Sequence, residues 1–283
     1  MIAPCRFLGP CRAHLVPAVR TCIALGALSL GALFLSALFL GCGGDKGTTP
    51  DDPEGRLTLK FSYSIDDAPL VMNTADYPYE NAAGNEYKVV GLKHYITGVQ
   101  LRRLNGTSFE STDVHLLNAA DPTTLAFTIG QIPAGPYSSI QILVGVDDTR
   151  NVEGGLPATL DNFNMQWPRQ LGGGYHNVMA EGRYKAGAAD STWTVHLGKV
   201  KHDPNETFYH NHVVEVIVPG SGISFSDDSW EVSIDVNLNQ WFVTPTVYDF
   251  ATYGSFIMDQ HEPQEILIAN ARDAFTVKSK VRL

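Results

Sequence analysis

Alternation of hydrophobic and polar residues dominates the chain from residue 57 onwards. In the first such run, Leu57, Leu59, Phe61, Tyr63 and Ile65 alternate with threonine, lysine and serine. Because successive side chains of a strand point to opposite faces, this pattern predicts a strand with one buried face. Similar runs between turn residues predict nine further strands, at 86–90, 94–104, 113–117, 125–129, 137–146, 176–184, 192–197, 212–218 and 230–242.

Only one segment has helical spacing. Pro263 suits a first helical position, and apolar or small residues then recur every three or four positions as far as Ala274. A short strand over 275–277 would close the chain. About ten strands joined by short turns predict an all-β fold, an antiparallel β-sandwich of immunoglobulin-like or related type, with one short C-terminal helix. We expect residues 56–283 to form this single domain.

The N-terminal segment has the pattern of an export signal. Arginines precede an apolar run over 22–40, which ends in small residues around Cys42. This order predicts a bacterial lipoprotein signal peptide over 1–41, with Cys42 lipidated; the alternative is an uncleaved anchor helix. Residues 42–55 carry no large apolar side chain and predict a flexible tether. We therefore expect a membrane-tethered protein of the cell envelope, periplasmic or on the outer membrane.

Composition excludes several classes of partner and of metal site. The chain has 30 acidic and 20 basic residues and a formal charge of -10, which argues against nucleic-acid partners. All four cysteines precede residue 43, so a metal site in the domain would use histidine, methionine, carboxylates or backbone oxygens. Sequence motifs of hydrolases and nucleotide-binding loops are absent, and we expect no catalytic activity.

Histidines are concentrated in one region. Four of the nine lie between residues 196 and 212. His210 and His212, two residues apart where the chain enters a predicted strand, would share one face, and His202 lies across a turn from them. These three side chains could hold an ion such as zinc; the alternative is a solvated hairpin with hydrogen-bonded imidazoles. His94 and His196 lie in other strands, where a histidine is more often a hydrogen-bonded core or rim residue.

Two further groups could bind metals. Met165 offers a thioether, which suits Cu(I), and Trp167 an aromatic wall that excludes water; the alternative is that both fill core space. Oxygen-bearing side chains follow the strand at 137–146 and could hold calcium, although a turn capped by such side chains explains them equally well. These side chains are Asp147, Asp148, Asn151 and Glu153.

Several segments, taken in order, resemble the MbnP-like family. They are 87–104, 114–118, 132–151, 160–167, 174–175, 181–182 and 195–198. The resemblance implies an exported all-β domain that binds copper, accompanied by a di-haem protein similar to bacterial cytochrome c peroxidases. In copper-binding members that partner oxidises a tryptophan at the copper site to kynurenine. By motif, His196 matches the family's His-x-Gly, and Met165 and Trp167 match its Met-x-Trp, so Trp167 is the candidate for modification.

The chain departs from the family pattern at three places. Arg169 stands where a second tryptophan is common, glycines 172–174 lengthen the loop, and His94 stands where an aromatic residue is common. If the second tryptophan is the modified one, this chain cannot be modified there.

The leading hypothesis is a tethered, non-catalytic copper-binding protein. His196 and His94 would donate nitrogen, Met165 would be a soft axial ligand, and Trp167 would lie beside the ion. One alternative is the zinc site of His202, His210 and His212. The other is a lipid-anchored structural or interaction domain, with calcium or zinc at most structural.

Overall fold

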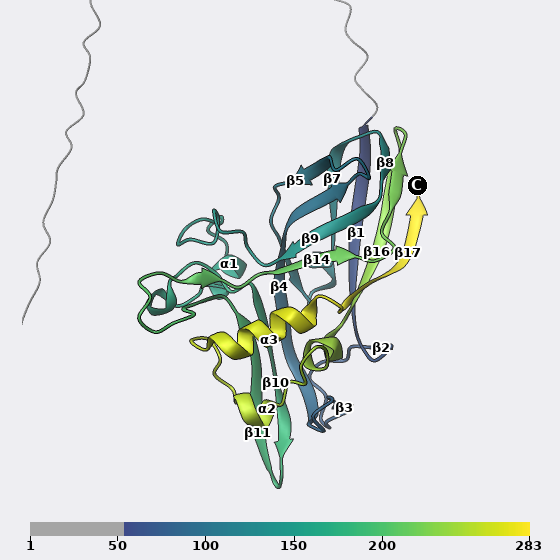
Figure 1. Ribbon diagram of the computed structural model, residues 1–283. Coiled ribbons are helices and arrows are strands. Elements are labelled where there is room, and N and C mark those ends of the chain that lie inside the picture. The colour runs from purple at the N-terminus through teal and green to yellow at the C-terminus, as the bar shows by residue number, and fades with distance from the viewer. Residues whose placement is uncertain (1–53) are drawn as a thin grey trace, which may run out of the picture. The chain divides into compact units, whose positions relative to one another are not determined.

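The computed structural model describes residues 54–283, and the predicted signal peptide and Cys42 lie outside this range. The first strand begins at Glu54, so the last two residues of the predicted tether belong to the domain. The predicted all-β sandwich with a short C-terminal helix is confirmed (Figure 1). None of the helices in residues 54–283 is both long and apolar enough to cross a bilayer.

The first sheet has five strands in the order β17-β16-β1-β2, with β7 also pairing with β1. Their bounds are β1 (Glu54–Ile65), β2 (Ala68–Pro69), β7 (Ala126–Pro133), β16 (Ser229–Asn237) and β17 (Phe275–Arg282). β1 and β16 run parallel, in register from Arg56 opposite Ser229 to Ser64 opposite Asn237, whereas the other ladders of this sheet are antiparallel. Two strands that are far apart in sequence, β1 and β16, thus form the centre of the sheet.

The second sheet has the order β11-β10-β4-β9-β14, with β3, β5 and β6 pairing along the long strand β4. The strands of this sheet are β3 (Tyr79–Glu80), β4 (Glu86–Arg102), β5 (Ser108–Ser111), β6 (His115–Asn118), β9 (Ser139–Val144), β10 (Val178–Ala186), β11 (Ala189–Leu197) and β14 (Val214–Val218). Two small ladders join β12 (Lys199–Val200) to β13 (His210–Asn211) and β15 (Ile223–Phe225) to β8 (Gly135–Tyr137). β4 merges two predicted strands, because the segment between them continues the ladder to β10.

Helices occupy little of the domain. The α-helices are α1 (Leu160–Asn164), α2 (Phe250–Tyr253) and α3 (His261–Ala271), and the 3-10 helices are η1 (Pro122–Thr124), η2 (Arg169–Leu171) and η3 (Leu238–Phe242). α3 begins two residues before Pro263, the predicted first helical position. It lies across the molecule in Figure 1 and contacts β11, β14 and η3.

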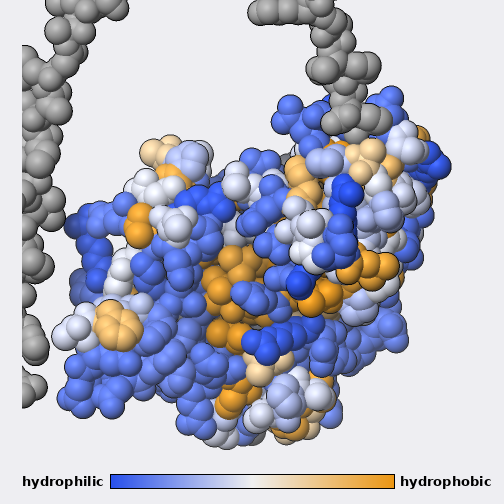
Figure 2. All heavy atoms as spheres, turned by 45° about the horizontal axis from the view of Figure 1, so that its top comes forward, coloured by the Kyte–Doolittle hydropathy of each residue, from blue (hydrophilic) through white to orange (hydrophobic). Residues whose placement is uncertain are grey.

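The buried faces of both sheets share one core. In β1 the alternating residues predicted to face inward are all buried. Aromatic rings fill the end of the core nearest α2, where Trp193 stacks on Phe250 and Tyr87 meets both rings edge-on. The outer surface in Figure 2 is mostly hydrophilic, in keeping with the acidic composition, with an apolar area near the middle of that face.

His94 belongs to this core. It is 1% exposed, and its Nε2 lies 2.8 Å from the Tyr63 hydroxyl of the facing sheet. Its Nδ1 lies 3.4 Å from the carbonyl of Tyr95. A neutral ring satisfies both contacts, with Nδ1–H facing the carbonyl and Nε2 accepting from the hydroxyl. Burial lowers the pKa of His94 to about 4.

We expect His94 to make the fold sensitive to acid. Between the unfolded pKa near 6.5 and the folded value, the unfolded chain takes up a proton that folded His94 cannot accept. Stability therefore falls as the pH drops through this window, by up to about 3 kcal/mol from this residue. His94→Gln, which cannot titrate, should show a shallower decrease when urea unfolding is followed between pH 7 and pH 4. Parallel pH profiles for the two proteins would contradict this prediction.

Candidate metal centres

The loop that carries Trp167 is built by short local interactions. Thr159 caps α1 by accepting a hydrogen bond from the backbone of Asn162. Beyond α1 the chain folds back on itself, since Gln166 bridges to Tyr175 and the Trp167 amide donates to the carbonyl of Gly174 at 2.9 Å. Gly174 has a φ of 91°, and a Cβ there would lie 2.3 Å from the side-chain oxygen of Asn151. Glycine is therefore required where this loop returns to β10.

The indole of Trp167 packs directly against the backbone beside His196. It is 2% exposed, and its Nε1–H donates to the carbonyls of Leu171 and Lys199, each at 3.0 Å. A Cβ on Gly198 would lie 2.4 Å from the indole ring. The glycine two residues after His196 thus leaves the space that Trp167 fills, which gives the His-Leu-Gly spacing a structural reason.

Trp167, His176 and His196 form a row of rings. The centroids of Trp167 and His176 are 4.8 Å apart, those of His176 and His196 are 5.0 Å apart, and both pairs meet edge-on. Nε2 of His196 lies 2.9 Å from Oε1 of Glu181, and Nδ1 of His176 lies 3.2 Å from the carbonyl of Met165. Each imidazole therefore has one nitrogen oriented by a hydrogen-bond partner and a second that can bind an ion.

Burial favours the neutral form of the His176 imidazole. Burial, and then the neighbouring His196, lowers the pKa of His176 to about 4. The hydrogen bond with His196 lowers the pKa of Glu181, which keeps a carboxylate against that ring. Because only a neutral imidazole can be a metal ligand, His176 is ready to bind an ion at neutral pH.

The structure separates His94 from His196. Val178 of β10 pairs with both His94 and Leu197, whereas the next residue, Met179, pairs with His196. Side chains alternate between the faces of a sheet, so His94 points into the core and His196 points away from it. The ligand pair expected from the sequence is therefore not brought together, and His176 takes the place expected of His94 beside His196.

Met165 lies close to these rings through its backbone. Its carbonyl accepts from the backbone amide of His176 at 2.7 Å and faces the His176 ring. Its side chain is fully buried in a small apolar cluster that includes Tyr95, Val146 and Tyr175. This packing agrees with the core-filling alternative.

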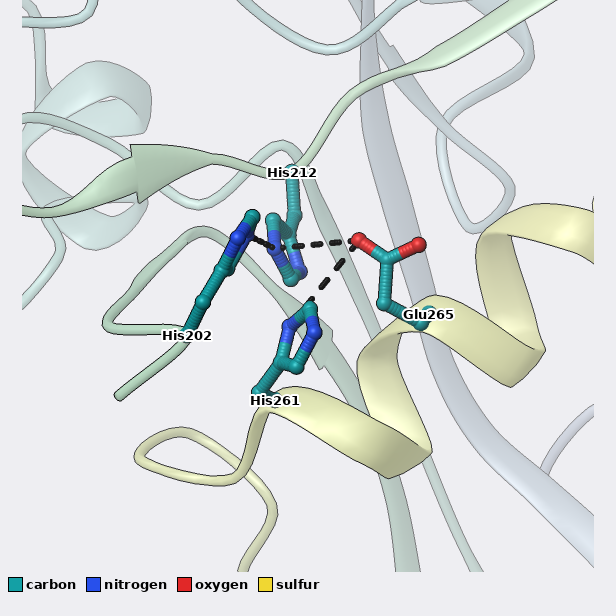
Figure 3. Close-up of side chains that lie close together, drawn as sticks. All are labelled: His202, His212, His261 and Glu265. Carbon is teal, nitrogen blue, oxygen red and sulfur yellow. Dashed lines mark hydrogen bonds and ion pairs between the residues drawn. The ribbon is translucent and has the colours of Figure 1, made fainter. Parts of the chain in front are cut away.

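A second group of side chains lies beside α3. The ligand atoms of His202, His212, His261 and Glu265 all lie within 4.8 Å of one another (Figure 3). His202 follows β12 and His212 follows β13, whereas His261 and Glu265 lie one turn apart on α3. The structure thus brings His202 and His212 together as the sequence suggested, and adds two groups from a distant helix.

His210 lies next to this group and outside it. Its ring stacks on His202 with 3.5 Å between centroids, and its Nε2 lies 3.2 Å from Oε2 of Glu206. β13 ends at Asn211, so the alternation that would have placed His210 and His212 on one strand face does not continue.

The oxygen-bearing side chains considered for calcium do not converge on one another. Asp147 caps its own turn and pairs with Arg150, and Glu153 pairs with Arg169. Asn151 is fully buried in a different network. The turn-capping alternative accounts for these contacts.

That network consists of three asparagines, Asn151, Asn177 and Asn211. The Asn151 and Asn177 amides both donate to the side-chain oxygen of Asn211, each at 2.8 Å. Asn177 directly follows His176, and Asn211 directly precedes His212. The network therefore links the backbones that carry the two histidine groups.

Sequence reasoning missed His176, His261 and Glu265. His261 and Glu265 are four residues apart in α3, a spacing that puts two side chains on one face of a helix. The predicted helix begins at Pro263 and therefore leaves His261 out. His176 stands two residues after Gly174 in the Trp167 loop, and its role depends on how that loop closes.

The fold and these side chains define an all-β sandwich with two candidate metal centres. The family model described as MbnP matches residues 54–259, and the chain therefore belongs to the MbnP family. The chain also resembles MbnP from Methylosinus trichosporium, at 20% identity and a TM-score of 0.43, over 67% of this chain and 77% of that one. No curated protein matches the chain. His261 and Glu265 lie beyond the span that the family model matches.

Proposed function

We propose that this protein is an exported, non-catalytic copper-binding protein, and that copper binds between His176 and His196 beside Trp167. The observation that carries the proposal is the pair of imidazoles whose centroids lie 5.0 Å apart, with Trp167 packed on one of them. The resemblance of the Met-x-Trp and His-x-Gly segments to the MbnP-like family supports copper as the ion.

The residues present fit a copper ion. A nitrogen-metal bond of roughly 2 Å puts each ring centre roughly 3 Å from the ion, so two rings on one ion lie within roughly 6 Å. The spacing of His176 and His196 is compatible with a bent pair of ligands. Nitrogen donors without a thiolate, in a water-poor pocket, suit copper in an exported protein. Glu181 would orient His196 from the second nitrogen of its ring.

Variants of this pair test the copper site. We expect His176→Ala and His196→Ala to lose the Cu(I) ion that the wild type retains against a chromophoric Cu(I) chelator. Glu181→Gln should weaken binding by about 10–100-fold, because it removes the carboxylate that orients His196. His115→Ala is the control, since His115 of β6 stacks on Phe127 of β7, away from both centres. Equal copper affinity in the wild type and in both alanine variants would refute this site.

Two finer features belong to the same proposal. Trp167 is the candidate for oxidation to kynurenine by a di-haem partner, because it contacts His176 and matches the family's Met-x-Trp. Cys42 is the candidate lipid anchor that would tether the protein in the cell envelope.

Mass spectrometry of protein purified from its native membrane tests both features. We expect an acylated N-terminal Cys42 and a kynurenine in the peptide that contains Trp167, with about one copper per chain by metal analysis. An unmodified Trp167 together with no copper, even after titration, would favour the alternative of a lipid-anchored structural or interaction domain.

A further inference from the structure

We propose that the domain carries a second metal centre, separate from the copper site, in which His202, His212, His261 and Glu265 bind one zinc ion (Figure 3). This proposal does not depend on the proposed function. It rests on the distances between the ligand atoms, on the donor types and on the elements that supply them.

The distances match a tetrahedral ion. Nε2 of His212 lies 3.3 Å from Nε2 of His202 and 3.3 Å from Oε1 of Glu265. A tetrahedral zinc ion with bonds of roughly 2.0–2.1 Å holds its ligand atoms roughly 3.3–3.4 Å apart. Nδ1 of His261 lies 4.0 Å from the same Glu265 oxygen, within reach after a small side-chain rotation. One ion could therefore bind all four groups without backbone movement.

One nitrogen that faces this group lacks another partner. Nδ1 of His261, the atom that lies 4.0 Å from Glu265, is buried and has no hydrogen bond among the described residues. His212, whose Nε2 faces the same group, is 3% exposed. Buried polar atoms are nearly always satisfied in native proteins, so an unpartnered nitrogen beside convergent ligand atoms indicates a missing partner.

The supporting contacts hold both halves of the centre in place. The His212 amide donates to the carbonyl of Gly198 at 3.0 Å, and the Gly198 amide donates to Oε1 of Gln264 at 3.2 Å. Gln264 is fully buried, and its amide nitrogen donates to the carbonyl of Ile257 just before α3. The first turn of α3 is thus fixed against the segment that carries His212, and a zinc ion would fasten the 199–212 segment to this helix.

The donor set selects zinc. Three imidazoles and one carboxylate are borderline ligands that Zn²⁺ accepts in tetrahedral geometry. Calcium and magnesium require oxygen ligands, and the carboxylate of Glu265 is a hard donor that the soft Cu(I) ion disfavours. His261 and Glu265 lie beyond the matched span of the family model, so the family match does not itself supply these two ligands.

Zinc titration of the chelator-treated protein, followed by native mass spectrometry, tests the proposal. We expect one Zn²⁺ per chain in the wild type, in His176→Ala and in His196→Ala, because those histidines belong to the copper site. Binding should fall at least 10-fold in His261→Ala and Glu265→Gln, whose side chains are partly exposed and whose replacement leaves the core intact. His210→Ala should keep the stoichiometry, because His210 stacks outside the ligand group. Substitution with Co²⁺ should give the intense visible absorption of a tetrahedral centre.

Three outcomes would overturn the proposal. The first is equal Zn²⁺ affinity in the wild type, His261→Ala and Glu265→Gln. The second is loss of Zn²⁺ from His176→Ala or His196→Ala, which would place the ion at the other centre. The third is a wild type that binds Cu²⁺ and no Zn²⁺. Failure of the copper proposal alone would leave the zinc stoichiometry unchanged, so the two proposals fail separately.

Discussion

Asn177→Ala should destabilise the domain by about 3–5 kcal/mol and weaken metal binding at both centres. Asn177 is fully buried, and its side chain makes four hydrogen bonds. Its oxygen accepts from the Val146 amide at 2.9 Å and from Asn151 at 3.2 Å. Its nitrogen donates to Asn211 at 2.8 Å and to the carbonyl of His212 at 2.7 Å.

The expected cost follows from the partners that alanine would leave behind. Each buried polar group that loses its hydrogen bond costs about 1–3 kcal/mol, and the amide of Val146 is among those groups. The backbones next to His176 and His212 would also lose the link between them, so both histidine groups would be held less firmly.

Urea unfolding and the two metal titrations measure this effect. Asn105→Ala is the matched control, because Asn105 is exposed in a turn and its side chain bonds only within that turn, to Thr107. We expect the control to cost at most about 1 kcal/mol and to leave both metals bound. An Asn177→Ala protein as stable as the Asn105→Ala protein would show that the network does not hold the loops.

Gly182→Ala should cost at least about 3 kcal/mol, because the added methyl group has no room. A Cβ at this position would lie 2.0 Å from the backbone carbonyl oxygen of Lys88 and 2.4 Å from Nε1 of Trp193. The nearest obstacle belongs to the backbone of β4, and Trp193 is 1% exposed in the core, so neither can move easily. The pairing of β10 with β4 already shifts register between Glu181 and Gly182.

Thermal unfolding and tryptophan fluorescence test this prediction. Gly91→Ala is the matched control, since Gly91 lies opposite Glu181 on the partner strand and a Cβ there would meet nothing within 4 Å. We expect the control to unfold at a temperature close to that of the wild type. Displacement of Gly182 would also move Glu181 away from His196, so copper affinity should fall with stability. Equal melting temperatures for the two alanine variants would contradict the close approach of β4 and β10.

Strand positions follow from local alternation, and the sequence therefore predicts most of them. The run from Leu57 to Ile65 lies within β1, and all its inward-facing residues are buried. The short helices α1 and α2 escaped prediction because five and four residues are too few to establish helical spacing. The parallel pairing of β1 with β16 could not be predicted from local sequence patterns, because it joins segments more than 160 residues apart.

The candidate site residues likewise fall into those that the sequence identifies and those that only the tertiary structure brings together. The sequence by itself determined the all-β fold, the thiol-free domain and the motifs around Trp167 and His196, because alternation, composition and short spacings are local properties. Only the tertiary structure decided which histidines meet. A one-residue offset in register puts His94 in the core and His196 outside it, and loop closure brings His176 to His196. The packing of α3 brings His261 and Glu265 to His202 and His212, a contact between distant segments that no local pattern encodes.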